Sequence, residues 1–241
     1  LNPLFMTETA APTGTKIVDK YPGVLKPLGI TPSVRRMTVV VPDEAALWAE
    51  DYLRKAGPLI HRKLAVLVVG TTWLTKNWPP GFFAMTARLL SRDYTVVLCG
   101  GKGEITAAKR IAAAAGVPVI NAVGETSLLE MAALLNRAAV VITGDTGPLY
   151  IAAALDVPTV ALFGPTDPEL LNPEGRQHVF VVRPQPCSYC YKQRCPNGKL
   201  DCMSNIHPAA VVQKAYAISR NRTEMPSGEK YPLRRAVVSR I

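Results

Sequence analysis

Six short apolar runs, separated by helical patterns, constrain the fold of this chain more than any other feature. The runs are nearly continuous in Val, Leu and Ile, as in parallel strands that are covered on both faces. They span Leu64–Val69, Thr95–Cys99, Val117–Ile120, Val140–Thr143, Thr159–Phe163 and Val179–Val182. The helical patterns span Gly81–Ser91, Glu104–Ala115, Leu128–Asn136 and Leu149–Leu155, and Pro208–Arg220 is predicted as a final helix. This alternation predicts an α/β fold, a doubly wound, Rossmann-like parallel sheet with helices on both faces.

Single residues refine this prediction. Ser127 and Glu130 have the spacing of a capping box, and Gly116 stands where a helix C-cap is expected. Cys99, at the end of an apolar run, is predicted in the core. The three histidines form no cluster in the sequence, and we expect them at the surface or in turns; they are His61, His178 and His207.

Residues 1–60 follow a different pattern. Prolines interrupt this stretch, and only Thr38–Val41 and Asp43–Lys55 look like regular structure, which is too little for a complete second domain. We therefore expect residues 1–60 to be the remnant or exit end of a preceding domain, with a Rossmann-like domain over 61–207. A C-terminal helix over 208–220 and a basic tail over 221–241 complete the predicted organisation.

The charge of the chain indicates its class of partner. Lys and Arg number 28 against 18 Asp and Glu, and this formal net charge of +10 favours a nucleotide, a phospholipid surface or a nucleic acid. No apolar run approaches the roughly 18 residues that span a bilayer. Five cysteines in such a chain fit a reducing compartment better than a disulfide scaffold. We expect a cytoplasmic protein.

A turn after the fourth apolar run carries the strongest ligand signal. Asp145, Thr146 and Gly147 lie between this run and a helical pattern, and Pro148 suits the first helical position. Such a turn leaves unpaired N–H groups at a helix N-terminus, which favour a phosphate. Gly147 permits close approach to the main chain, and Thr146 can cap the helix or donate its hydroxyl. An ordinary capped turn without a ligand explains the same residues, so the neighbouring loops are needed to distinguish the two interpretations.

Two further loops follow the first and second runs. Thr71 and Thr72 offer hydroxyls, and Lys76 offers a cation that can neutralise a diphosphate. Lys102 and Glu104 follow the second run in a Gly-rich turn and can meet a ribose or a base. This turn lacks the G-x-G-x-x-G spacing of dinucleotide sites. Because the carboxyl ends of parallel strands share one edge, these loops predict one ligand site there.

These loops together resemble glycosyltransferase family 9, the heptosyltransferases that build the inner core of bacterial lipopolysaccharide. The resemblance covers about residues 38 to 220. It rests on Thr71-Thr72 with Lys76 and Trp78-Pro79, then on Asp145–Pro148, and then on Phe163–Pro168. The last of these is a fixed turn that we expect to support the loop that carries Asp145. It implies a two-domain GT-B fold whose C-terminal domain holds the donor, and residues 1–60 resemble only the end of the N-terminal acceptor domain. It also implies inverting, metal-independent transfer of heptose from ADP-L-glycero-β-D-manno-heptose to a lipid-linked saccharide. The enzyme would lie in the cytoplasm, peripheral on the inner membrane.

The resemblance also implies roles for individual residues. Donor binding falls to Thr71, Thr72, Lys76, Lys102, Glu104, Thr126, Asp145, Thr146, Gly147 and Tyr150. Lys76 and Asp145 would act in catalysis, by stabilising the leaving group and by orienting the donor sugar. The family usually has His at the position of Tyr150, so a different nucleotide-sugar transferase on a GT-B framework stays as an alternative. The family's general base lies in the N-terminal domain, and we expect this chain to bind donor but to turn over poorly.

Four cysteines form a compact group with the spacing C-x2-C-x4-C-x6-C, namely Cys187, Cys190, Cys195 and Cys202. A C-x-x-C pair within four thiols is typical of structural zinc or iron–sulfur sites, although disulfides or reduced thiols explain it too. We keep a structural zinc site as the candidate, and with it a zinc-dependent nucleic-acid module as a less favoured function. Aromatic residues make up only 7% and do not interleave with basic ones, so nucleic acid is not the expected partner.

Overall fold

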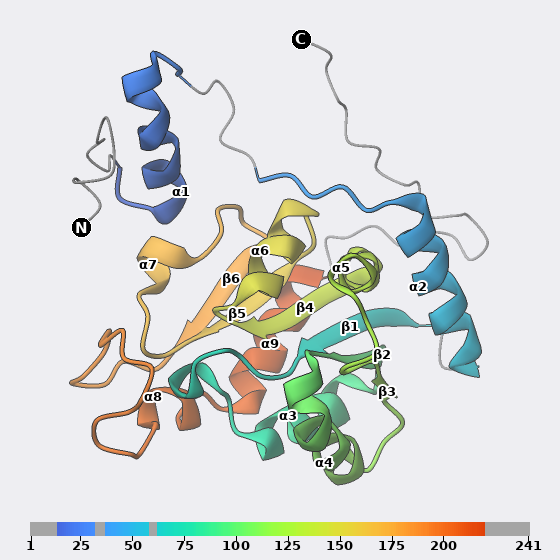
Figure 1. Ribbon diagram of the computed structural model, residues 1–241. Coiled ribbons are helices and arrows are strands. Elements are labelled where there is room, and N and C mark those ends of the chain that lie inside the picture. The colour runs from blue at the N-terminus through green and yellow to red at the C-terminus, as the bar shows by residue number, and fades with distance from the viewer. Residues whose placement is uncertain (1–13, 32–36, 58–61, 220–241) are drawn as a thin grey trace.

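The computed structural model describes residues 14–31, 37–57 and 62–219. Six parallel strands form one sheet in the order β3-β2-β1-β4-β5-β6 (Figure 1). They are β1 (Lys63–Val68), β2 (Tyr94–Cys99), β3 (Ile120–Asn121), β4 (Ala138–Gly144), β5 (Thr159–Phe163) and β6 (His178–Val182). This is the strand order of the doubly wound Rossmann fold, in which the direction of winding reverses between β1 and β4. The predicted fold class is therefore confirmed.

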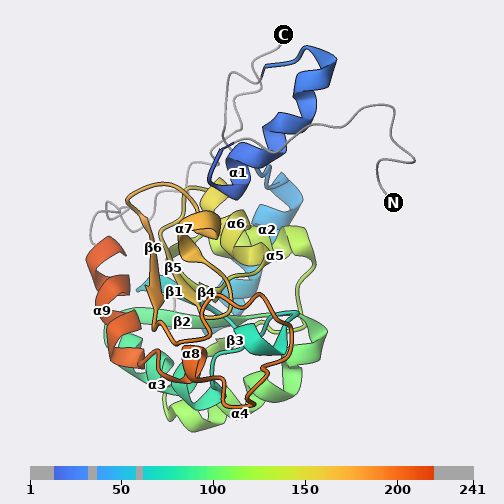
Figure 2. The same ribbon diagram turned by 90° about the vertical axis from the view of Figure 1, so that its left-hand side faces the viewer.

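Helices cover both faces of the sheet (Figures 1 and 2). One face carries α2 (Asp43–Lys55), α5 (Leu128–Asn136) and α6 (Gly147–Ala154), and the other carries α3 (Pro80–Leu90), α4 (Ile105–Ala115) and α9 (Pro208–Ser219). The short elements are α1 (Ile17–Lys20), η2 (Tyr21–Leu28), η4 (Leu74–Lys76), η5 (Lys102–Glu104), α7 (Pro168–Leu171) and α8 (Asp201–Ser204). None of the described helices combines the length and apolarity that crossing a bilayer requires.

Strand β1 shows why the apolar runs are nearly continuous. Ala65 and Leu67 pack into the core beneath α3, α4 and α9, whereas Val66 and Val68 pack into the core beneath α2 and α5. Successive side chains of a strand point to opposite faces, and here both faces are covered by helices. Each of these four side chains is therefore excluded from water, and each has to be apolar.

The predicted helix ends are largely confirmed. The capping box of Ser127 and Glu130 is present, and Gly116 caps α4 in the left-handed conformation at a φ of 64°. Gly147 is the first residue of α6, so Pro148 takes the second helical position, one residue later than predicted. Thr146 is the N-cap residue, but its side chain makes no capping hydrogen bond.

Three predictions about regular structure need correction. The third strand covers only Ile120–Asn121, since it pairs with β2 alone at the edge of the sheet. Thr38–Val41 forms neither helix nor strand, because none of the six described strands pairs with it. Residues 14–31 contain α1 and η2, where the prolines suggested irregular chain; Pro22 is tolerated in the first turn of η2. The end of the final helix at Arg220 and the predicted basic tail lie outside the described residues.

The predicted surface position of His178 is wrong. His178 is buried as the first residue of β6, opposite Thr159 of β5 in the register of the two strands. Its Nδ1 lies 3.0 Å from Thr159 Oγ1. Burial lowers the pKa of His178 below its ordinary value of 6.5, and nearby Asp156 acts more weakly in the opposite direction. The folded protein therefore favours the neutral imidazole.

We expect the free energy of unfolding to fall as the pH drops below 6.5. In that range His178 of the unfolded chain binds a proton, whereas His178 of the folded chain becomes protonated only at a lower pH. The unfolded state then binds more protons, so this contribution to stability is complete above pH 6.5 and is lost as the pH falls through the lowered pKa. Thermal unfolding at several pH values should show a weaker pH dependence for His178→Gln than for the wild type. The exposed His207→Gln is the control, and equal dependence in the wild type and His178→Gln would contradict the account.

Candidate functional site

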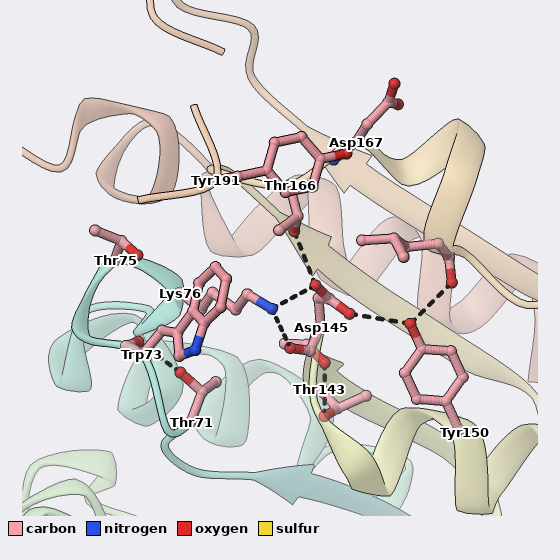
Figure 3. Close-up of polar contacts among 12 residues, drawn as sticks. Thr71, Trp73, Thr75, Lys76, Thr143, Asp145, Tyr150, Thr166, Asp167 and Tyr191 are labelled. Atoms are coloured by element: carbon pink, nitrogen blue, oxygen red, sulfur yellow. Dashed lines mark hydrogen bonds and ion pairs between the residues drawn. The ribbon is translucent and has the colours of Figure 1, made fainter. Parts of the chain in front are cut away.

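The candidate site lies at the carboxyl end of the sheet between β1 and β4, where the strand order reverses. Three loops meet there, and Figure 3 shows their side chains converging on Asp145. The loop after β1 carries Thr71 to Lys76, the loop after β4 carries Asp145 and Thr146, and the loop after β5 carries Gly164 to Asp167. The buried strands fix the roots of these loops, so the site is built on a rigid scaffold.

Two glycines allow the loops to approach one another. Gly70 has a φ of 82°, and a Cβ at this position would lie 2.2 Å from Cγ of Glu104. Gly144 ends β4, and a Cβ there would lie 3.0 Å from Cγ2 of Thr71. Glu104 therefore reaches across from the loop after β2 to the loop after β1. A side chain at either glycine would push these loops apart.

A buried ion pair between Lys76 and Asp145 stands at the centre of the site (Figure 3). Lys76 Nζ lies 2.6 Å from Asp145 Oδ2 and donates a second hydrogen bond, at 3.2 Å, to the backbone oxygen of Asp145. The two side chains are only 14% and 5% exposed, so solvent ions screen the pair little. The ring of Trp73 lies 4.3 Å from Nζ and adds a cation–π contact. These contacts hold the ammonium group of Lys76 at one point.

Two hydroxyl groups complete the surroundings of the Asp145 carboxylate. Thr166 donates to Oδ2 at 2.9 Å, and Tyr150 lies 3.2 Å from Oδ1. The Tyr150 hydroxyl also lies 3.1 Å from the backbone oxygen of Leu171, so its single proton can be donated to either of these two oxygens. Burial, and then the charge of Asp145, raises the pKa of Tyr150, which keeps the phenol a donor. A buried carboxylate needs this compensation, since burying an unpaired charge is costly.

Several predicted donor-binding residues surround this pair. The hydroxyl of Thr71 donates to the backbone oxygen of Trp73 at 2.7 Å, and thereby shapes its own loop. Thr72 is exposed on the same loop. Thr146 and the exposed Gly147 form the start of α6, beside Asp145. The structure thus brings residues from the loops after β1 and β4 to one place, as predicted.

The other predicted residues lie on the β2–β3 side of the reversal point. Lys102 is exposed at the start of η5, and Glu104 is half-buried against Gly70. The hydroxyl of Thr126 is buried and has no hydrogen-bond partner among the described residues. Within the described part of the chain, no hydrogen bond joins these three side chains to the Lys76–Asp145 pair. Their predicted contacts with a donor therefore stay predictions.

Two contacts of the site were missed by the sequence analysis. The loop around Thr166 was expected to act as a buttress, which is confirmed, but its direct bond to Asp145 was not foreseen. The available signal was that both residues follow neighbouring strands, β4 and β5, which pair in parallel. The contact between Trp73 and Lys76 has no comparable signal, since it depends on the local path of η4.

The four cysteines between Cys187 and Cys202 line one small cavity against the loop after β5. All four are free thiols. Among the residues that the structure describes, no group of three or more His, Cys, Asp or Glu side chains stands in a ready-made metal-binding arrangement. The segment is bonded to the site loops, because Thr75 donates to Lys192 O at 2.6 Å and Tyr191 N donates to Pro165 O at 2.8 Å.

Comparisons with known proteins found a matching family model and similar solved structures. Residues 15–201 match the family model described as glycosyltransferase family 9 (heptosyltransferase). A solved glycosyl transferase family 9 structure from Veillonella parvula is similar with a TM-score of 0.75 and 26% identity, over 90% of this chain and 64% of that one. No curated protein matches the chain significantly.

Two E. coli structures share the fold at lower identity. ADP-heptose lps heptosyltransferase II has a TM-score of 0.64 and 23% identity, over 79% of this chain and 56% of that one. Heptosyltransferase WaaC, solved with ADP, has a TM-score of 0.56 and 23% identity, over 89% of this chain and 61% of that one. The chain therefore spans less than two thirds of the length of each of these structures.

Proposed function

This chain belongs to glycosyltransferase family 9, and from that premise we propose that it holds the sugar-nucleotide donor in an inverting heptosyl transfer. The donor is ADP-L-glycero-β-D-manno-heptose, and the acceptor is a lipid-linked saccharide of the lipopolysaccharide inner core, on the cytoplasmic side of the inner membrane. Because the chain spans less than two thirds of its solved relatives, the proposal assigns it mainly the donor-binding half. Activation of the acceptor is assigned to residues outside it.

The buried Lys76–Asp145 pair is the observation that supports this proposal most. The leaving group of such a transfer is a nucleoside diphosphate, which gains negative charge as the bond to the sugar breaks. An ammonium group has three N–H donors, and two of those of Lys76 are used by Asp145. The third is available for a phosphate oxygen without loss of the ion pair. In this proposal Lys76 and the N-terminus of α6 stabilise the departing diphosphate, and no metal ion takes part in the transfer.

Asp145 has a different role in the proposal. Its carboxylate offers about four lone-pair positions, and hydrogen bonds from Lys76, Thr166 and Tyr150 use three of them. The remaining position suits a hydroxyl of the donor sugar. Because donors from three different elements fix the carboxylate, a sugar bound there would be held for in-line attack on its anomeric carbon. The ADP in the E. coli WaaC structure supports an adenine nucleotide for this chain.

A second candidate function is transfer from a different nucleotide sugar on the same framework. The observation in its favour is Tyr150, which stands where the resemblance leads us to expect His. Its phenol is neutral and bulkier than an imidazole, and it lies against the carboxylate that would meet the sugar. A changed donor sugar or nucleotide would suit such a change.

Calorimetric titration with ADP, UDP and GDP separates these candidates. We expect ADP to bind at least about tenfold more tightly than UDP or GDP, which corresponds to about 1.4 kcal/mol. Tightest binding of UDP or GDP would support the second candidate. Absence of nucleotide binding, together with salt-sensitive binding of an oligonucleotide, would contradict both and support the nucleic-acid module.

A further inference from the structure

Four thiols line a single cavity, although Cys187, Cys190 and Cys195 come from an irregular loop and Cys202 comes from α8. The loop brings them together by backbone conformations that L-residues seldom adopt. Tyr191 and Leu200 have φ values of 53° and 55°, and strained backbone of this kind persists only where its surroundings stabilise it. Four reduced thiols that line one cavity are a suitable ligand set for a metal ion that prefers sulfur.

Cys195 lies in a tight turn of the backbone that contributes to the same cavity. Gly198, with a φ of 70°, donates its backbone N–H to Cys195 O at 3.3 Å, and Lys199 N donates to Asn197 Oδ1 at 3.2 Å. Basic side chains of the same segment add positive charge, at Lys192, Arg194 and Lys199.

We propose that Cys187, Cys190, Cys195 and Cys202 bind one soft divalent metal ion, zinc, as a tetrahedral tetrathiolate site that holds the donor-binding loops in place. The thiols lose four protons on binding, and the resulting complex carries two negative charges. Cys195 now donates to Asn197 Oδ1 at 2.8 Å, and loss of its proton ends that contact. Because the described residues hold no ready-made metal-binding arrangement, the proposal requires the four thiols to move closer together when the ion binds.

The proposed site is attached to two of the three loops of the candidate site, those after β1 and β5. Thr75, next to Lys76, donates to Lys192 O at 2.6 Å, so the cysteine segment holds the loop after β1. Gly164 lies so close to Cys202 that a Cβ there would be 2.9 Å from its sulfur. The same loop carries Thr166, which bonds Asp145. Metal binding thus limits the movement of two groups that fix the Lys76–Asp145 pair. This positioning role rests on the proposed function, whereas the metal site itself does not.

Metal analysis of the whole chain, purified without chelators, tests the site. We expect one zinc per chain, and a tetrahedral thiolate absorption spectrum after exchange for Co²⁺. Cys190→Ser and Cys202→Ser should lose the metal, and Cys99→Ala should keep it, because that buried thiol lies in β2. If the serine variants fail to fold, stepwise blocking of thiols in the wild type should release one zinc per four thiols.

The alternatives give distinct results in the same measurements. One equivalent of iron in place of zinc would support the tetrathiolate site and change only the identity of its ion. Four free thiols without bound metal, even after addition of Zn²⁺ or Fe²⁺, would overturn the proposal. Disulfides within the segment, found by thiol counting in denaturant without reductant, would overturn it as well.

ADP affinity tests the positioning role. We expect chelation to weaken ADP binding by about fivefold or more, the usual lower range of coupling between two sites. Thr75→Val should weaken it too while the metal content stays at one, because it removes only the bond to Lys192. A bound metal whose removal leaves ADP affinity unchanged would overturn the positioning role. Absence of ADP binding to the metal-loaded chain would overturn the proposed function and this role, but not the metal site.

Discussion

Replacement of Lys76 by alanine is expected to weaken ADP binding by about thirtyfold. A hydrogen bond to a charged group contributes about 2 kcal/mol, and this is close to that factor in affinity. Lys76 places a positive charge at the reversal point of the sheet, where Asp145 and Trp73 hold its ammonium group in place. Calorimetric titration of the variant with ADP measures the loss directly.

Control variants make this result specific. Lys214→Ala removes the same charge from the exposed side of α9 and should leave ADP affinity unchanged. Lys76→Arg keeps the charge but changes its geometry, so an intermediate affinity is expected. Unchanged ADP affinity in Lys76→Ala would show that the ammonium group contacts no phosphate.

The Asp145→Ala variant is expected to lose about 3–5 kcal/mol of the free energy of unfolding, the usual cost of breaking a buried ion pair from one side. The substitution leaves the ammonium of Lys76 in a largely buried position without its counter-ion. It also removes the acceptor of the Thr166 and Tyr150 hydroxyls. Denaturant-induced unfolding of the variant and of the wild type measures the difference.

A double variant separates stability from binding in this site. Replacing both charges, as Lys76→Met with Asp145→Leu, should recover most of the lost stability, because apolar residues of similar size often replace a buried pair without cost. The same double variant should bind ADP about thirtyfold more weakly than the wild type, as Lys76→Ala does. Asp51→Ala is the control for loss of a carboxylate, since Asp51 pairs with Arg54 and Lys55 at the exposed surface, where ion pairs contribute little. A stability loss in Asp145→Ala no larger than that in Asp51→Ala would contradict the account.

The sheet itself could be predicted because its strands are covered on both faces. The continuous apolar runs of β1 and β4 follow directly from that burial, and so does the alternation with helices. The edges of the fold were less predictable. β3 is short and Thr38–Val41 is irregular because a strand forms only where a neighbouring strand pairs with it. The sequence of one segment alone does not show which neighbour it will have. The burial of His178 has the same origin, since it depends on the register of β6 against β5.

The site could be predicted as a set of loops, but not as a set of contacts. Lys76 and Asp145 were each chosen for their place after a strand, and the parallel sheet brings those strand ends to one edge. That they form an ion pair depends on β1 and β4 being neighbours, which is a property of strand order. The bond from Thr166 requires in addition that β5 lies next to β4. The roles of Lys102, Glu104 and Thr126 stay predictions, since they lie on the other side of the reversal point.

A crystal structure of the chain with ADP tests the central claim most directly. The account predicts the diphosphate between the loop after β1 and the N-terminus of α6, with a phosphate oxygen in hydrogen-bond contact with Lys76 Nζ while the bond from Lys76 to Asp145 is kept. Nucleotide bound elsewhere on the sheet, or a diphosphate out of reach of Lys76, would contradict it.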